Sequence, residues 1–173
     1  MRGACCARAT RSASAGEGGI WYGGDSLETA CAEVAYWRDR FIIQSAGLAK
    51  DDSELVTRHT FFRAVADGVA IDLTSEPWSV RGETWTHPTD YTGTQALAGE
   101  ARSRGIEWIR YASVRSPGAQ EPRSPGAHCA AVLSVPALAK ALPQDFDEWH
   151  CRATRHRVSL FSRSSGRTYS WDF

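Results

Sequence analysis

The sequence predicts an α+β fold in a single domain. Its 173 residues are enough for one well-packed core and too few for two ordinary domains. Apolar residues make up 42% of the chain and charged residues 23%, which is typical of a globular protein. Two segments have helical periodicity and about six have strand character. This tally indicates an α+β fold.

The first helix is expected to begin near residue 27 and to end near Ile43. Asp25-Ser26-Leu27-Glu28 has the pattern of a capping box, in which Asp25 accepts from free amides of the first turn and Glu28 reaches back. Residues at helical spacing then form one stripe that faces a core: Leu27, Ala30, Cys31, Val34, Arg38 and Phe41. Glu33 and Trp37 lie at the edge of that stripe.

A β-hairpin is predicted next, from residues 55–66 and 69–73. Both segments are rich in strand-forming residues, and Asp67-Gly68 between them is a strong type I′ turn signal. Residues 74–88 contain Pro77, Gly82 and two tryptophans, so we expect a long loop packed down by its own aromatic side chains.

The second half of the chain is expected to hold one more helix and the remaining strands. The helix covers residues 91–104, with Asp90 or Thr89 as its cap and Gly105 in the left-handed conformation that ends helices. Strands are predicted for 106–112 and 128–135, and a closing hairpin for 148–161 and 167–173. Two Ser-Pro-Gly-Ala repeats within residues 116–127 predict a mobile surface insertion, and the first ten residues are expected to be irregular.

Composition argues against several classes of function. Lys and Arg (20) balance Asp and Glu (20), so no overall field would attract nucleic acid or an acidic membrane. No apolar run approaches the roughly 20 residues of a membrane span, and a secretory signal is missing, which predicts a cytoplasmic protein. The alternative is a mitochondrial transit peptide, because the segment before Glu17 is rich in Ala, Arg and Ser.

The five cysteines predict neither a disulfide framework nor a metal site. They are odd in number and form no CxxC pair. The dipeptides His128-Cys129 and His150-Cys151 could supply ligands in principle, but adjacent residues on a strand point to opposite faces.

Three places could carry chemistry. Tyr22 lies between two glycine pairs, where it contacts a ligand or simply packs in a turn. Glu33 is either a solvated helix carboxylate or a carboxylate aimed into a cleft. Ser113-Val114-Arg115 follows a predicted strand, where α+β proteins tend to place ligand contacts.

Three blocks of the chain, taken in order, resemble the RES domain, a bacterial toxin family. The first block is Gly19-Ile20-Trp21-Tyr22-Gly23-Gly24 with residues 27–34, the second is residues 86–98, and the third runs from Gly105-Ile106 to Ser113-Val114-Arg115. The resemblance places the family's named arginine, glutamate and serine at Arg11, Glu33 and Ser113. Arg8 is the alternative to Arg11, and the segment before this arginine is shorter than is usual in the family.

The resemblance implies a fold like that of ADP-ribosyltransferase toxins, with small antiparallel sheets, flanking helices and NAD bound in a cleft between the sheets. It implies cleavage of the nicotinamide–ribose bond, with Glu33 stabilising the oxocarbenium-like ribose. Arg11 would hold the pyrophosphate and Ser113 a ribose or phosphate oxygen. Further NAD-binding candidates are Tyr22, beside the nicotinamide ring, and then Arg115 and Tyr91.

Several alternatives stay open at this point. The acceptor is water or inorganic phosphate, which would make the enzyme an NAD glycohydrolase or phosphorylase. The same residues would also serve an ADP-ribosyltransferase that modifies a protein, and a shortened, inactive domain would only bind its antitoxin. The implied partner is an antitoxin of the Xre type with a helix-turn-helix part, and the implied assembly is a homodimer or a toxin–antitoxin hetero-oligomer, without a metal.

Overall fold

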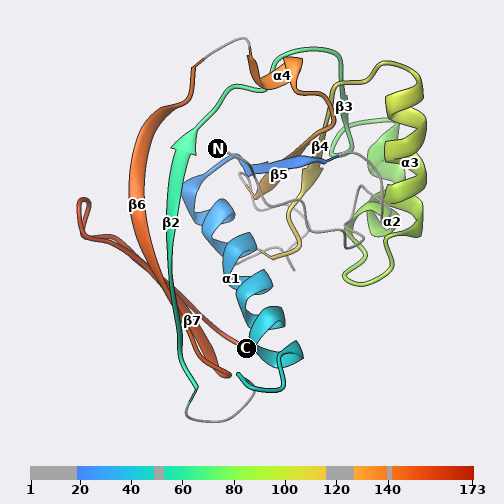
Figure 1. The fold of residues 1–173 in the computed structure, drawn as a ribbon. Helices are drawn as coiled ribbons and strands as arrows, with labels where there is room; N and C mark the ends of the chain where they lie inside the picture. Colours follow the sequence, from blue (N-terminus) through green and yellow to red (C-terminus); the bar gives the residue numbers. More distant parts are fainter. Residues whose placement is uncertain (1–18, 49–52, 116–126, 140–141) are drawn as a thin grey trace.

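The structure is a computed structural model that describes residues 19–48, 53–115, 127–139 and 142–173. Within these ranges two four-stranded sheets lie on either side of one long helix, α1 (Leu27–Gln44), as Figure 1 shows. The predicted α+β class is confirmed. No helix in the described ranges has both the length and the apolar character that crossing a membrane requires.

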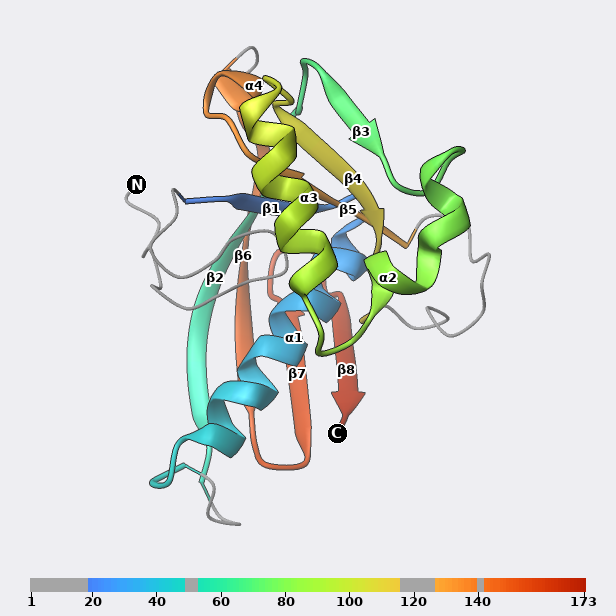
Figure 2. The same ribbon diagram turned by 90° about the vertical axis from the view of Figure 1, so that its right-hand side faces the viewer.

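The first sheet has the strand order β1-β5-β4-β3. Its strands are β1 (Trp21–Gly24), β5 (His128–Val132), β4 (Trp108–Ala112) and β3 (Ala70–Asp72). The β1–β5 and β5–β4 pairs are antiparallel, whereas β3 pairs with β4 in parallel. One face of this sheet is covered by η1 (Trp78–Arg81), α2 (Gly82–Thr86) and α3 (Thr92–Ser103), as Figure 2 shows. The short α4 (Pro136–Ala139) follows β5.

The second sheet is fully antiparallel and has the order β2-β6-β7-β8. Its strands are β2 (Leu55–Arg63), β6 (Gln144–Ala153), β7 (Arg157–Ser162) and β8 (Thr168–Asp172). The predicted closing hairpin is confirmed as β7–β8. The segment 148–161, which the sequence suggested as one arm, folds back on itself as β6 and β7.

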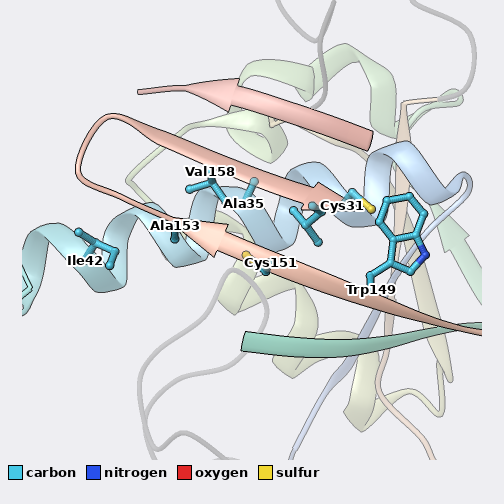
Figure 3. Packing of buried hydrophobic residues seen from close by; sticks show 8 residues of the cluster. Cys31, Ala35, Ile42, Trp149, Cys151, Ala153 and Val158 are labelled. Carbon is cyan, nitrogen blue, oxygen red and sulfur yellow. The ribbon is translucent and has the colours of Figure 1, made fainter. Parts of the chain in front are cut away.

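Small side chains let α1 pack closely against the second sheet. Cys31, Ala35 and Ile42 lie on one stripe of the helix and are fully buried. Figure 3 shows this stripe facing side chains of β6 and β7, with the Trp149 indole at one end. The sheet side of this core consists of Trp149, Cys151, Ala153, Val158 and Leu160. This contact fixes α1 along the sheet and so fixes the direction in which its other side chains point.

The first sheet has its own core on the face beneath α2 and α3. Ile109 and Tyr111 of β4 and Cys129 and Ala131 of β5 point to this face, where they meet Trp85 and the helix alanines. Alternate residues of a strand share a face, so Ser113, two residues beyond Tyr111, continues the same row. The side chain of Ser113 therefore points to the same face of the sheet as Tyr111.

The predicted capping box at the start of α1 is wrong in its details. The cap is Ser26, whose side chain accepts from the amide of Thr29 at 3.1 Å. Asp25 instead pairs with Arg110 of β4, with 2.9 Å between its Oδ2 and Nη2. A charge-assisted bond to a residue so distant in sequence exists only in the tertiary structure, and it draws Asp25 away from the helix terminus.

The predicted hairpin of residues 55–66 and 69–73 is also wrong. Strand β2 pairs with β6 in the second sheet, and β3 pairs with β4 in the first. Gly68 has a positive φ of 138°, but Asp67 does not, so the predicted type I′ turn is also wrong. A bend at residues 68–69 connects the two sheets instead. There the Val69 amide donates to the Glu107 carboxylate at 2.9 Å, and a side chain on Gly68 would overlap that carboxylate.

The remaining predicted elements are present in the structure, but some begin or end at different residues. Helix α3 covers Thr92–Ser103, and Gly105 has the expected left-handed φ of 73°. Its N-cap is Tyr91 rather than Asp90 or Thr89, although Asp90 accepts from the Thr92 amide at 2.9 Å. The predicted loop 74–88 contains η1 and α2, and the Trp85 indole donates to the Trp78 carbonyl at 2.7 Å. Of the expected insertion, residues 116–126 lie outside the described part of the chain, as do the first ten residues.

Candidate functional site

A carboxylate from α1 and a serine from the end of β4 meet at the junction of the two halves of the fold. Glu33 is half-buried on α1, and Ser113 is only 3% exposed. The Ser113 hydroxyl donates to Glu33 Oε1 at 2.8 Å. The Ser113 amide donates to the Ala127 carbonyl at 2.7 Å, just before β5 begins, so the backbone that carries the hydroxyl is itself tied to the sheet.

The Ser113 hydroxyl is held from two sides. It accepts from the Arg115 amide at 3.2 Å while it donates to Glu33. Because an amide can only donate, this contact leaves the hydroxyl proton directed at the carboxylate. In the described part of the chain, the hydrogen bonds to Glu33 come from Ser113 and Cys129, and both reach Oε1.

Cys129 of β5 also lies next to the Glu33 carboxylate. Its Sγ lies 3.7 Å from Glu33 Oε1, and the side chain is almost fully buried. Burial and the nearby negative charge of Glu33 raise the pKa of Cys129 to about 12. The thiol therefore stays protonated near neutral pH, which suits a weak donor to Glu33 and not a nucleophile.

Arg115 connects this pair to the helix and to the loop before α3. Its guanidinium Cζ lies 3.6 Å from the centroid of the Tyr36 ring, a cation–π contact. Its Nη2 donates to the Pro88 carbonyl at 2.8 Å. Tyr36 is one turn after Glu33 on α1, so the same arginine that fixes Ser113 through its amide also fixes the loop against the helix.

A second arginine approaches the same ring. The Cζ of Arg40 lies 5.7 Å from the Tyr36 centroid. Its Nε and Nη2 both donate to Asp39 Oδ2, at 3.0 and 2.6 Å. The Asp39 side chain is fully buried, whereas the Arg40 side chain is 40% exposed. Asp39 therefore holds the guanidinium from the protein interior, and part of the Arg40 side chain faces solvent.

The tyrosines named from the sequence lie at two edges of this region. The Tyr91 hydroxyl donates to the Pro88 carbonyl at 3.1 Å, so Tyr91 and Arg115 share one acceptor. Tyr22 is on β1 opposite Ala131 and is 37% exposed. Since paired residues of neighbouring strands share a face, Tyr22 projects from the same face of the sheet as Cys129.

The structure therefore brings Glu33, Ser113, Arg115 and Tyr91 together and puts Tyr22 on the same sheet face. Arg11 and its alternative Arg8 lie outside the described residues. Sequence reasoning missed Tyr36, Arg40 and Cys129. For the first two a signal existed, because they follow Glu33 by three and seven residues on a helix. No sequence pattern links Cys129 to Glu33, since the packing of α1 against the first sheet sets their distance.

Fold and site together define an α+β protein in which a helix carboxylate is held by a buried serine, next to two arginines. Compared with protein families, the sequence matches the RES domain over residues 6–154, which is most of the chain. The chain belongs to the RES domain family, and the resemblance noted from its three sequence blocks is confirmed. Membership indicates an NAD-acting domain of the kind found in toxin–antitoxin systems. No curated protein matches the chain at a significant level.

Proposed function

We propose that this protein is the toxin of a toxin–antitoxin pair and that it cleaves the bond between nicotinamide and ribose in NAD. The observation that carries the proposal is the bond from Ser113 to Glu33 Oε1, which orients the carboxylate. Membership of the RES family supplies the substrate class.

The chemistry of this bond suits a fixed carboxylate. When the C1′–N bond breaks, its electron pair goes to the pyridinium nitrogen, and nicotinamide leaves as a neutral molecule. The ribose is left with oxocarbenium character, and a nearby negative charge stabilises it. An oxygen of the acceptor then bonds to C1′ and loses its proton. Glu33 would stabilise the cation through the ribose hydroxyls, in a site where partial burial strengthens the electrostatic interaction.

The other residues would bind and orient the substrate. Ser113 holds Glu33 in place, so its contribution is positioning of the carboxylate. Tyr22 offers an exposed ring on the correct sheet face for the nicotinamide. Arg11 stays the family-based candidate for the pyrophosphate. Tyr91 would act through the Pro88 loop that it shares with Arg115.

The test is to incubate the purified protein with NAD, with and without inorganic phosphate, and to quantify nicotinamide and the ribosyl product. The Glu33→Gln variant should lose nicotinamide release by at least a hundredfold, because it keeps the shape of the side chain and removes its charge. Glu28→Gln is the matched control: it makes the same change on an exposed position of α1 and should keep parental activity. Equal activity of the parent and Glu33→Gln would overturn the proposal.

The product identifies the acceptor. ADP-ribose indicates water, and a phosphorylated ADP-ribose indicates inorganic phosphate. Transfer to an added protein, detected as ADP-ribosylated polypeptide, would indicate an ADP-ribosyltransferase that uses the same residues.

A growth assay tests the biological part of the proposal. Expression of the parent should arrest growth and deplete cellular NAD, and expression of Glu33→Ala should do neither. The proposed partner is an antitoxin with a helix-turn-helix part, and its co-expression should restore growth. A Glu33→Ala variant as toxic as the parent would separate toxicity from NAD cleavage and contradict the toxin mechanism.

A further inference from the structure

Three side chains of α1 form a stripe that begins at the candidate catalytic carboxylate. Glu33, Tyr36 and Arg40 follow one another at spacings of three and four residues, which places them on one side of the helix. At a rise of about 1.5 Å per residue, the stripe is roughly 10 Å long. Arg115 reaches the middle of this stripe from the end of β4.

Two guanidinium groups converge on the Tyr36 ring. Their Cζ atoms lie 3.6 Å (Arg115) and 5.7 Å (Arg40) from its centroid. The negative face of an aromatic ring attracts a cation, so both guanidinium groups interact with the same side chain. Their positive charges repel each other, and a bound anion would relieve that repulsion.

Contacts with described residues use only some of the donors of each arginine. A guanidinium carries five N–H groups. In the described part of the chain, Arg40 donates through Nε and Nη2 to one oxygen of Asp39, and Arg115 donates through Nη2 to the Pro88 carbonyl. The Nη1 groups of both side chains are not used in these contacts. Each guanidinium is thus held in a fixed orientation and can still bind a ligand.

The Asp39 charge does not block this role. Its carboxylate is fully buried, whereas 40% of the Arg40 side chain is exposed. An anion that approaches from solvent meets the guanidinium first, and buried Asp39 acts as its anchor. Arginine with a fixed fork of donors is the side chain best suited to phosphate oxygens.

We infer that Arg40 and Arg115, held on the Tyr36 ring, form a phosphate-binding site beside Glu33. Its role in turnover rests on the proposed NAD cleavage, but its binding of phosphate oxygens does not. Two sources supply this chemistry: the pyrophosphate of NAD, which is one ribose away from the scissile bond, and inorganic phosphate as acceptor.

The test is calorimetric titration of the full chain with ADP-ribose and, separately, with inorganic phosphate at low ionic strength. Removing Arg40 alone would leave a buried, unpaired carboxylate and could unfold the protein. We therefore compare the double variant Asp39→Asn/Arg40→Gln with the single variant Asp39→Asn. The two differ only in the Arg40 guanidinium, and neither contains the Asp39 charge. Arg115→Met tests the other arginine, and Arg58→Gln, an exposed arginine on β2, controls for loss of one positive charge.

Either source gives a distinct result. If the site holds the pyrophosphate, removing either arginine weakens ADP-ribose binding by about tenfold and leaves phosphate binding unchanged. If it holds inorganic phosphate, the phosphate affinity falls by a similar factor and the ADP-ribose affinity does not. The inference is overturned if the parent binds neither ligand, if both affinities stay within twofold, or if Arg58→Gln weakens binding equally.

These outcomes are separate from those of the NAD assay. If the parent cleaves no NAD but removal of the two arginines lowers its ligand affinity, the proposed function is refuted and the phosphate site is kept. If the parent cleaves NAD and neither arginine affects its ligand affinities, the proposed function is kept and the phosphate site is refuted.

Discussion

The hydroxyl of Ser113 donates to Oε1 of Glu33 at 2.8 Å across 80 positions of sequence. The first residue extends the row of inward-facing side chains on β4, and the second lies on the helix that packs against the other sheet. The relative placement of the two halves of the fold is therefore what creates the pair, and changes on either side should disturb it.

Ser113→Ala should lower kcat/KM for NAD by roughly tenfold or more, because it removes the bond that orients Glu33 and leaves the Arg115 amide without its acceptor. The effect should fall mainly on kcat if the hydroxyl positions the carboxylate and does not bind NAD. Steady-state nicotinamide release measures both constants. Ser103→Ala removes an exposed hydroxyl from the end of α3 and should leave both unchanged.

The three described cysteines should resist thiol reagents at pH 8. Cys31, Cys129 and Cys151 are buried, and burial raises the pKa of the first two to about 12 and raises that of the third. A variant with Cys5 and Cys6 replaced by serine should show no rapid labelling when folded and full labelling in denaturant. Rapid labelling of Cys129 in the folded protein would mean that the environment of Glu33 opens readily.

Asp147 should make folding stability depend on pH in the acid range. Hydrogen bonds from the hydroxyls of Ser164 and Ser162 and from the Trp149 indole hold the pKa of this carboxyl below its usual value, although partial desolvation opposes them. The unfolded carboxyl titrates near 3.9, so this stabilisation is present above about pH 4 and is lost as the pH falls through the lower folded pKa.

Asp147→Asn should therefore lower Tm at pH 7 and lower it less at pH 3, since the parent loses its advantage on protonation. Thermal unfolding at several pH values measures this difference. An equal loss at both pH values would assign the effect to packing and not to charge. Asp172→Asn affects a carboxylate at the far end of β8 that pairs with Arg157, and it serves as a comparison on the same sheet.

Gly24→Ala should destabilise the protein by about 1–3 kcal/mol and reduce NAD cleavage. An added Cβ would lie 2.8 Å from the backbone nitrogen of Ala30, so the first turn of α1 must move, and Glu33 moves with it. Gly99→Ala on α3 is the matched control: its Cβ would meet nothing within 4 Å, and the change should stabilise the helix by up to about 1 kcal/mol. Denaturant unfolding and nicotinamide release together check both variants.

Several local elements follow from patterns among residues that are neighbours in the chain. The helical periodicity from Leu27 onward predicted the span of α1, although Phe41 of the expected stripe is 49% exposed and Ala35 and Ile42 are buried instead. Gly105 predicted the end of α3 through its left-handed backbone. The three family blocks determined membership of the RES domain family and drew attention to Glu33 and Ser113. Each of these features depends on short segments of the chain or on the order in which such segments follow one another.

Which strands pair and which distant side chains come into contact depends on packing in three dimensions. Gly68 has the positive φ that the sequence suggested, but Asp67 does not, so the type I′ turn does not form. Strands β2 and β3 pair with β6 and β4, which lie far along the chain. Likewise, Asp25 does not cap the helix as expected, because it forms an ion pair with Arg110 of β4. Tyr36 and Arg40 could be placed near Glu33 by helical spacing, but the second guanidinium on that ring comes from the end of β4. Strand pairing and helix–sheet packing bring such residues together. The stabilisation from these contacts depends on distances in three dimensions, which a sequence pattern does not give.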